Sequence, residues 1–218
     1  MNSNEALFAL KALPRCPCAD FNAAIIASRE QCLGTAMPAL HALAKQIAPT
    51  ADPSDWEVGR ILELDLLHLE VFLLREKDER ARYAFVAPFL SQTDGWSIVD
   101  DLASHFKIKD LDLAYRMSLK FSKNSHPWVR RFAYSHLITS AKRLTSQQIT
   151  SLIVFNEAPD VAKAEAWLLA EGLIYHEEAL QEFLRNCPDV ALKRRAIQKA
   201  VESFRISPIS KDKLKSLR

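Results

Sequence analysis

Apolar side chains recur every three or four residues along most of the chain, which is the spacing of amphipathic helices. Segment 56–77 is the most apolar, and segment 83–90 repeats its apolar positions at the same interval. Thr93 or Asp94 is expected to cap a helix that begins at Trp96. Further helices are predicted over residues 110–123, 127–142, 145–155, 160–174, 177–186 and 189–204. Because no segment sustains the alternation of a half-buried strand, the pattern predicts an all-α protein.

Three short blocks in the second half of the chain begin with a proline and carry a valine two residues later. The prolines are Pro127, Pro159 and Pro188, and a basic residue follows each within the next turn. Proline is favoured in the first turn of a helix. A repeat of about 30 residues built from two helices is typical of an α-solenoid with one concave surface. We expect one such domain over residues 1–204, followed by a basic, disordered tail over residues 205–218.

The net charge of +2 conceals alternating blocks of charge. Residues 1–104 and 144–191 each carry a net charge of −6, whereas residues 105–143 and 192–218 each carry +7. Charge segregated in this way creates local positive fields. A polyanion is a natural partner for such fields, and nucleic acid is the commonest one. The alternative, that the blocks are solvated helix faces, stays open.

The composition argues against several classes of chemistry. The four glycines are too few for a phosphate-binding loop or a dinucleotide fingerprint. No apolar run is long enough for a membrane helix and no export signal is visible, so we expect reduced cysteines, a cytoplasmic location and no membrane partner. The six histidines lack the spacing of a ligand set, and Cys16 and Cys18 alone are too few for zinc. We therefore expect neither a metal nor a cofactor.

Three predicted helices place a tryptophan one turn from a charged side chain. The pairs are Trp96 with Asp100, Trp128 with Arg131, and Lys163 with Trp167. A lone tryptophan on an amphipathic helix is usually a packing residue. Aromatic faces, cations and one carboxylate together would nevertheless suit a nucleic-acid backbone that carries a reactive cationic centre.

Four blocks between Trp96 and Ala200 resemble, in order and spacing, the motifs of the AlkD-like DNA alkylation repair glycosylases, a family of HEAT-like repeats. The family motifs are W-D-x-V-D, W-x-x-R-x-A, K-A-x-G-W-x-L and K-R-x-A-I. The matching segments are residues 94–100 (DGWSIVD), 128–133 (WVRRFA), 163–169 (KAEAWLL) and 192–197 (LKRRAI). The first half of the chain is compatible with the family but carries no specific motif.

The resemblance implies a HEAT-like α-solenoid whose concave basic groove wraps duplex DNA. It implies excision of cationic N3- or N7-alkylated purines from that DNA, without metal or cofactor. By motif position, Asp100 would be the catalytic carboxylate, Trp96 and Trp167 would flank the deoxyribose, and Arg131 would help hold the backbone near the lesion. The remaining residues expected to contact DNA are Trp128, Arg130, Lys163, Lys193 and Arg194. We expect a monomer that acts on nucleoid DNA.

The chemistry of the lesion suits these roles. An alkylated purine carries a positive charge and leaves as a neutral molecule, so no general acid is needed. The charge passes to the sugar as an oxocarbenium-like state, as in glycoside hydrolysis. A fixed carboxylate stabilises that cation and can orient the attacking water. Each tryptophan face adds cation–π attraction of about 0.5–2 kcal/mol.

The sequence departs from the family motifs at several positions and leaves alternatives open. Ser97, Ala166 and Ala170 stand where the family has aspartate, glycine and arginine. Asp101 adjoins Asp100, so the carboxylate assignment is ambiguous by one residue, although helix geometry places Asp100 nearer the face of Trp96. The competing hypotheses are a non-catalytic HEAT-repeat scaffold that binds nucleic acid or protein, and an inactive relative that keeps only the fold.

Overall fold

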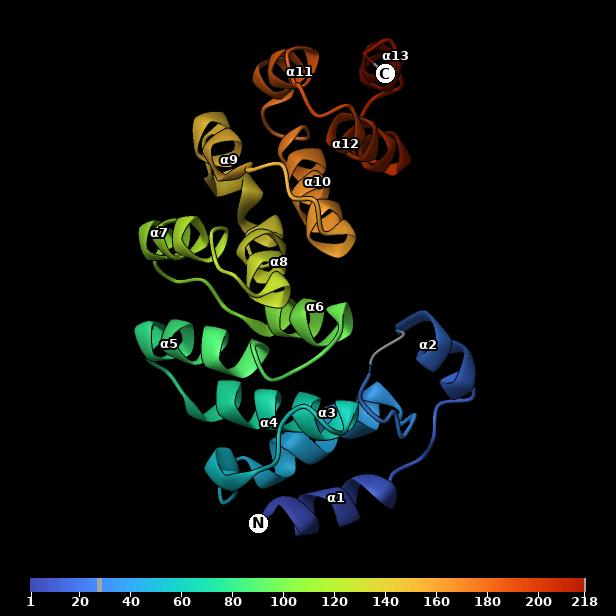
Figure 1. Ribbon diagram of the computed structural model, residues 1–218, viewed down its shortest axis with the longest axis vertical. Helices are drawn as coiled ribbons and strands as arrows, with labels where there is room; N and C mark the ends of the chain where they lie inside the picture. The colour runs from blue at the N-terminus through green and yellow to red at the C-terminus, as the bar shows by residue number, and fades with distance from the viewer. Residues whose placement is uncertain (27–28, 218) are drawn as a thin grey trace. The chain divides into compact units, whose positions relative to one another are not determined.

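The computed structural model describes residues 1–26 and 29–217, and within them the secondary structure is helical (Figure 1). The described residues contain no β-strand, only two isolated bridges that pair Arg15 with Thr35 and Gln31 with Ile61. The all-α prediction is therefore confirmed. The chain divides into two compact units, residues 1–107 and residues 108–218, and each is described by itself. The prediction of a single domain over residues 1–204 stays a prediction.

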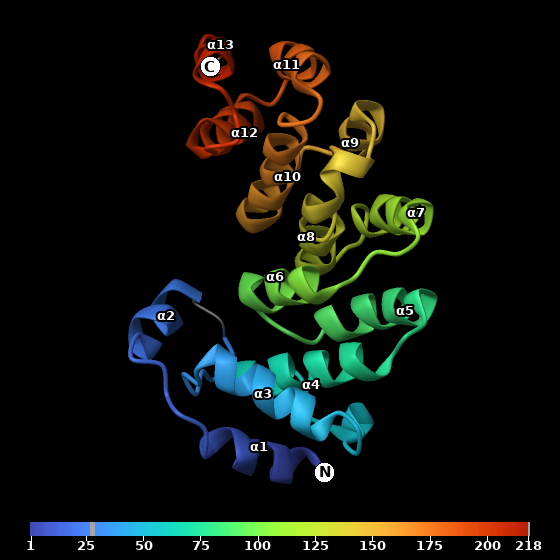
Figure 2. The same cartoon turned by 180° about the vertical axis from the view of Figure 1, so that it is seen from behind.

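The first unit is built around α4, a helix buried on nearly every face. Its helices are α1 (Ser3–Lys11), α2 (Ala19–Ile26), α3 (Met37–Ile47), α4 (Leu62–Arg75), α5 (Glu79–Leu90) and α6 (Trp96–His105), with a short 3-10 helix at Pro53–Asp55. α4 packs against α1, α3 and α6, and α3 lies across it in Figure 2. Leu67, Leu69 and Val71 of α4 are fully buried. This all-round burial explains why segment 56–77 is so apolar.

α4 begins at Leu62 rather than at Trp56, because the backbone turns at Gly59. Gly59 has φ +83°, a conformation that favours glycine. A Cβ atom at this position would also lie 2.1 Å from the carbonyl oxygen of Gln92. The Gly59 N–H donates to Asp65 Oδ2 at 2.9 Å, which fixes the turn to the first part of α4.

The second unit contains the three proline blocks. Its helices are α7 (Leu111–Phe121), α8 (Pro127–Ser135), α9 (Ser146–Leu152), α10 (Pro159–Gly172), α11 (Glu177–Arg185), α12 (Val190–Glu202) and α13 (Pro208–Lys215), with a 3-10 helix at Ile138–Arg143. α8 packs on α10, and α10 packs on α12. Pro127 and Pro159 are the first residues of their helices, as predicted. Pro188 instead precedes the N-cap residue Asp189 of α12.

The predicted N-cap of α6 is wrong, because the N-cap residue is Gly95 and not Thr93 or Asp94. Gly95 has φ +122°, which places it outside the range that a Thr or Asp cap adopts readily. The Thr93 hydroxyl donates to the Leu90 carbonyl, and the Asp94 carboxylate accepts from the Arg29 N–H at 2.8 Å. Both side chains thus hold the loop before α6.

The C-terminal segment 205–218, expected to be disordered, contains the helix α13, which packs against α12. Ile206 and Leu214 are buried, at 7% and 1% exposed. Ser207 caps the helix by accepting from the Ser210 N–H at 3.1 Å, and Pro208 occupies the first turn. Ser207 and Pro208 thus begin a helix within the segment expected to be disordered.

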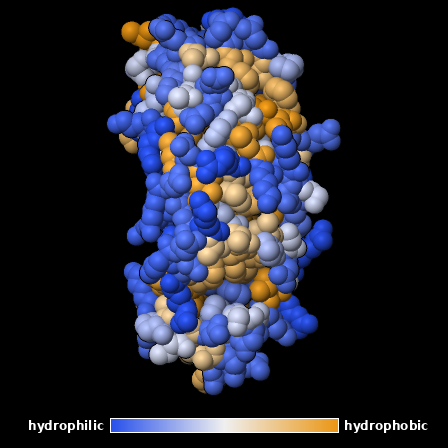
Figure 3. Space-filling view, turned by 90° about the vertical axis from the view of Figure 1, so that its left-hand side faces the viewer, coloured by the Kyte–Doolittle hydropathy of each residue, from blue (hydrophilic) through white to orange (hydrophobic). Residues whose placement is uncertain are grey.

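Hydrophilic side chains prevail on the face shown in Figure 3, and hydrophobic ones form smaller groups between them. Among residues 1–26 and 29–217, no helix combines the length and the apolar character needed to cross a membrane.

Candidate functional site

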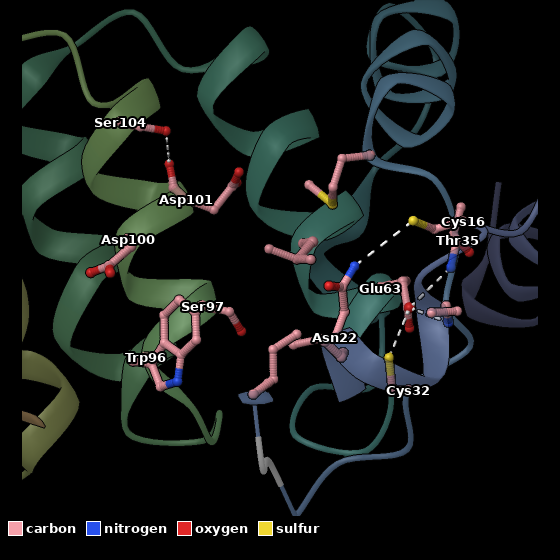
Figure 4. Close-up of a pocket in the computed structure, with 16 residues that line it drawn as sticks. Cys16, Asn22, Cys32, Thr35, Glu63, Trp96, Ser97, Asp100, Asp101 and Ser104 are labelled. Carbon is pink, nitrogen blue, oxygen red and sulfur yellow. Dashed lines mark hydrogen bonds between the residues drawn. The ribbon is translucent and has the colours of Figure 1, made fainter. Parts of the chain in front are cut away.

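In the first unit, α6 presents the predicted pair Trp96 and Asp100 one helical turn apart (Figure 4). Both side chains are half-buried. Asp100 and Asp101 reach to different sides of α6 (Figure 4). Asp101 Oδ2 lies 3.5 Å from His105 Nδ1 and is directed toward that ring. Both carboxylates line the cavity beside Trp96, but Asp101 is in contact with His105, whereas Asp100 lies one helical turn from Trp96.

A cavity of about 370 Å³ lies beside Trp96 within the first unit. Its walls come from α2, α4, α6 and the loop that precedes α3 (Figure 4). The α6 wall consists of Trp96, Ser97, Asp100, Asp101 and Ser104, and the α2 wall consists of Ala19, Asn22 and Ile26. The α2 segment carries no motif in the sequence. Its residues reach this site only through the packing of the first unit.

Glu63 of α4 fixes the loop wall of this cavity. Its carboxylate accepts hydrogen bonds from the backbone N–H groups of Leu33 at 2.8 Å and Gly34 at 2.7 Å. The Cys32 thiol donates to the same carboxylate at 3.4 Å. Burial, and secondarily the Glu63 charge, raise the pKa of the Cys32 thiol. The thiol is therefore a structural donor here and a poor nucleophile.

In the second unit, two cations from neighbouring helices lie close to Trp167 of α10. The Arg131 guanidinium carbon of α8 lies 5.3 Å from the centroid of the indole ring. Lys199 Nζ of α12 lies 5.1 Å from the same centroid. Trp167 itself is half-buried. Two cations thus lie close to the ring, and Glu202 lines the cavity next to it.

The two cations beside Trp167 differ in burial. Arg131 is only 2% exposed, and its Nη1 donates to the backbone carbonyl of Asp160 at the start of α10. Lys199 is exposed. Arg131 is expected from the motif to help bind the DNA backbone. In the structure its side chain is buried within the second unit, against Trp167 and the Asp160 carbonyl. An exposed lysine can move toward a bound anion, but a buried arginine acts first on its protein neighbours.

A wide cavity of about 650 Å³ opens next to Trp167, between α10 and α12. Its basic lining residues are Lys163, Arg194, Arg195 and Lys199. All four are exposed. Lys163 Nζ lies 3.1 Å from Asp160 Oδ1, so this lysine is also part of an exposed ion pair. Arg195 and Lys199 were not among the predicted site residues, although their i, i+4 spacing on α12 could have identified them.

Three other predicted DNA contacts lie outside this cavity. Arg130 Nη1 donates to the backbone carbonyls of Asn124 and Ser125, each at 2.8 Å, and so holds the loop before α8. Trp128 and Lys193 are half-buried. The predicted set therefore separates into a pair on α6 in the first unit and a tryptophan with its cations in the second. The joint action of these groups stays a prediction.

A comparison with known protein families places the chain in one of them. A family model described as DNA alkylation repair enzyme matches residues 9–204. No curated protein matches the chain. The family match spans most of the chain and includes both groups of residues. The chain therefore belongs to the family of DNA alkylation repair enzymes.

Proposed function

We propose that this protein is a DNA glycosylase that excises cationic N3- or N7-alkylated purines from duplex DNA. The observation that carries the proposal is the pair Trp96 and Asp100 on one face of α6, in a member of the DNA alkylation repair family. The serial packing of α8, α10 and α12 supports a HEAT-like arrangement of helix pairs. A cytoplasmic monomer that acts on nucleoid DNA belongs to the same proposal.

In the proposed reaction, the bond that breaks joins C1′ of the deoxyribose to the alkylated ring nitrogen. Its electron pair moves to the purine, which leaves neutral, and the sugar acquires oxocarbenium character. The Asp100 carboxylate stabilises that positive charge and orients water for attack on C1′. As the new C–O bond forms, the water gives one proton to the Asp100 carboxylate, which passes it to solvent. Asp100 is half-buried, so its charge is less screened by solvent than that of a fully exposed aspartate.

Trp167 and its neighbours supply the second part of the proposal. An indole face attracts a sugar that carries positive charge. Lys199 stands over the ring and is exposed, so we propose that it moves to a phosphate when DNA binds. Arg131 is buried against the same ring and is held by its hydrogen bond to the Asp160 carbonyl. Arg131 is thus a positioning residue for Trp167.

The cations beside Trp167 are proposed to bind the phosphate backbone. Lys163, Arg194, Arg195 and Lys199 line one cavity and are exposed. Residues 192–218, to which three of them belong, carry a net charge of +7. Neutralising phosphates releases counterions, so the affinity for duplex DNA should fall steeply as salt rises.

The first test is release of 7-methylguanine or 3-methyladenine from alkylated duplex DNA by the purified full chain. We expect release of both bases and none from undamaged duplex, because only the alkylated base leaves as a neutral molecule. Binding to the same duplexes is measured in parallel. Binding without release would favour the competing reading, a non-catalytic HEAT-repeat scaffold for nucleic acid.

A further inference from the structure

A cluster of two histidines and two carboxylates lies where α3, α4 and α6 meet in the first unit. It consists of His41 of α3, Glu70 of α4, and Asp101 and His105 of α6. One potential ligand atom from each of the four lies within 4.8 Å of all the others. Asp101 and His105 are one turn apart and therefore share a helix face. The imidazole rings of His41 and His105 have centroids 5.2 Å apart.

Three buried polar atoms of this cluster contact other members of the cluster. His41 Nδ1 and Glu70 Oε1 contact each other, and Asp101 Oδ2 lies 3.5 Å from His105 Nδ1. Glu70 is only 6% exposed, so its carboxylate has little access to water. The potential ligand atoms of the four side chains thus converge on one another, an arrangement that a bound cation can bridge.

We propose that His41, Glu70, Asp101 and His105 bind a divalent transition-metal ion, with Zn²⁺ as the best match. Imidazole nitrogens and carboxylate oxygens are both zinc ligands, and four protein ligands complete a tetrahedral site. The two carboxylates balance the 2+ charge of the ion. Small side-chain rotations bring ligand atoms at this spacing to the metal.

The site is reachable from solvent through a cavity of about 350 Å³. His41, Glu70 and His105 line this cavity, together with Lys45 and Lys107 near the cluster. The surrounding lysines repel cations, but the two carboxylates of the cluster attract them at shorter range.

Protons compete with a metal for this cluster. A histidine must be neutral and a carboxylate ionised to bind a metal ion, so filling this site releases any proton that its ligands hold.

All four ligands come from the protein, so the site is structural rather than catalytic. The bound ion would link α6 to α3 and α4. α6 also carries Trp96 and Asp100. The inference does not depend on the glycosylase activity. A protein without such activity would keep the same metal site.

The test begins with titration of the full, untagged chain with Zn²⁺ after treatment with a chelator. Thermal unfolding is then followed by differential scanning calorimetry with and without the metal, and the absorption spectrum is recorded with Co²⁺ in place of Zn²⁺. We expect one ion per chain and a higher thermal midpoint with metal bound. Co²⁺ should show the d–d bands of a tetrahedral site without a thiolate charge-transfer band. The absence of that band separates this cluster from Cys16 and Cys18.

His41→Gln and His105→Gln should each weaken Zn²⁺ binding by at least about 10-fold, since even outer-shell changes cost that much. Their side chains are 29% and 44% exposed, so both variants should fold, which circular dichroism checks. His126→Gln and the double change Cys16→Ser, Cys18→Ser are controls that should keep full affinity. No stoichiometric binding, or binding that survives His41→Gln and His105→Gln, would overturn the proposal.

Discussion

At the residue scale, helical spacing predicts which side chains are neighbours on a helix but not which of them are buried. Trp96 and Asp100 share a face of α6 as the i, i+4 spacing predicts. Asp101, equally acidic and adjacent, is directed toward His105. Arg131 matches a motif that suggests contact with DNA, yet it is buried against Trp167. Burial depends on α8 packing against α10, which a single motif does not encode.

Arg131 and Lys199 contact the same ring and should respond differently to substitution. Arg131→Ala removes a charged hydrogen bond to the Asp160 carbonyl, so the free energy of unfolding should fall by about 2 kcal/mol or more. Lys199→Ala removes an exposed cation, so stability should change by less than about 0.5 kcal/mol. The slope of log affinity for duplex DNA against log salt should fall by about one for Lys199→Ala.

Urea unfolding and DNA binding over a range of salt concentrations measure both effects. Arg131→Ala should leave the salt slope close to that of the wild type. A reduced slope for Arg131→Ala with unchanged stability would mean that Arg131, and not Lys199, contacts phosphate.

At the element scale, the C-terminal helix shows why composition misled the sequence analysis. Segment 205–218 is basic and has few apolar residues, which is typical of a disordered tail. α13 nevertheless forms, because Ser207 caps it and Leu214 is buried. Ile206 and Leu214 are the two buried apolar residues of this segment, and α13 packs against α12. The longer helices were predictable because their apolar periodicity is local.

The burial of Leu214 gives a direct stability test of α13. Leu214→Ala should lower the free energy of unfolding by about 2–5 kcal/mol, because Leu214 is 1% exposed. Ile209→Ala is the matched control on the same helix, since Ile209 is 72% exposed and should cost less than about 0.5 kcal/mol. Urea unfolding of both variants decides. Equal, small effects would show that α13 does not pack in solution.

His136, at the end of α8, should make stability depend on pH. Its ring is fully buried, stacks on Phe132 and donates from Nδ1 to the Phe132 carbonyl at 2.6 Å. Burial lowers the pKa of His136 from 6.5 to about 4. Below about pH 6.5 the imidazole is protonated in the unfolded chain but stays neutral in the folded chain. The free energy of unfolding therefore falls as pH drops toward 4, by about 3 kcal/mol in total.

His136→Gln removes this titration while keeping a hydrogen-bond donor. The difference in unfolding free energy between variant and wild type should therefore shift in favour of the variant as pH falls from 7 to 4.5. Urea unfolding at each pH measures it. A difference that stays constant over this range would show that His136 is protonated or solvated in the folded chain.

At the scale of the whole molecule, sequence motifs identified the family, whereas packing revealed the rest of each site. The blocks around Trp96, Arg131, Trp167 and Lys193 were readable because each lies within one helix. The cluster of His41, Glu70, Asp101 and His105 was not, because its members come from three helices and only packing brings them together. The histidines were judged by spacing along the chain, and only the i, i+4 spacing of Asp101 and His105 hinted at a shared site.

The central claim is that the Asp100 carboxylate stabilises the developing charge on the sugar. The most direct measurement is single-turnover release of 7-methylguanine from a defined duplex by wild type, Asp100→Asn and the control Asp112→Asn. Asp112 is exposed on α7, so its change tests loss of one negative charge alone.

Asp100→Asn should slow release by about 100- to 1000-fold, equivalent to about 2.7–4 kcal/mol, while duplex affinity stays the same or rises slightly. Asp112→Asn should release the base at the wild-type rate. Wild-type release by Asp100→Asn, from DNA bound with equal affinity, would contradict the account.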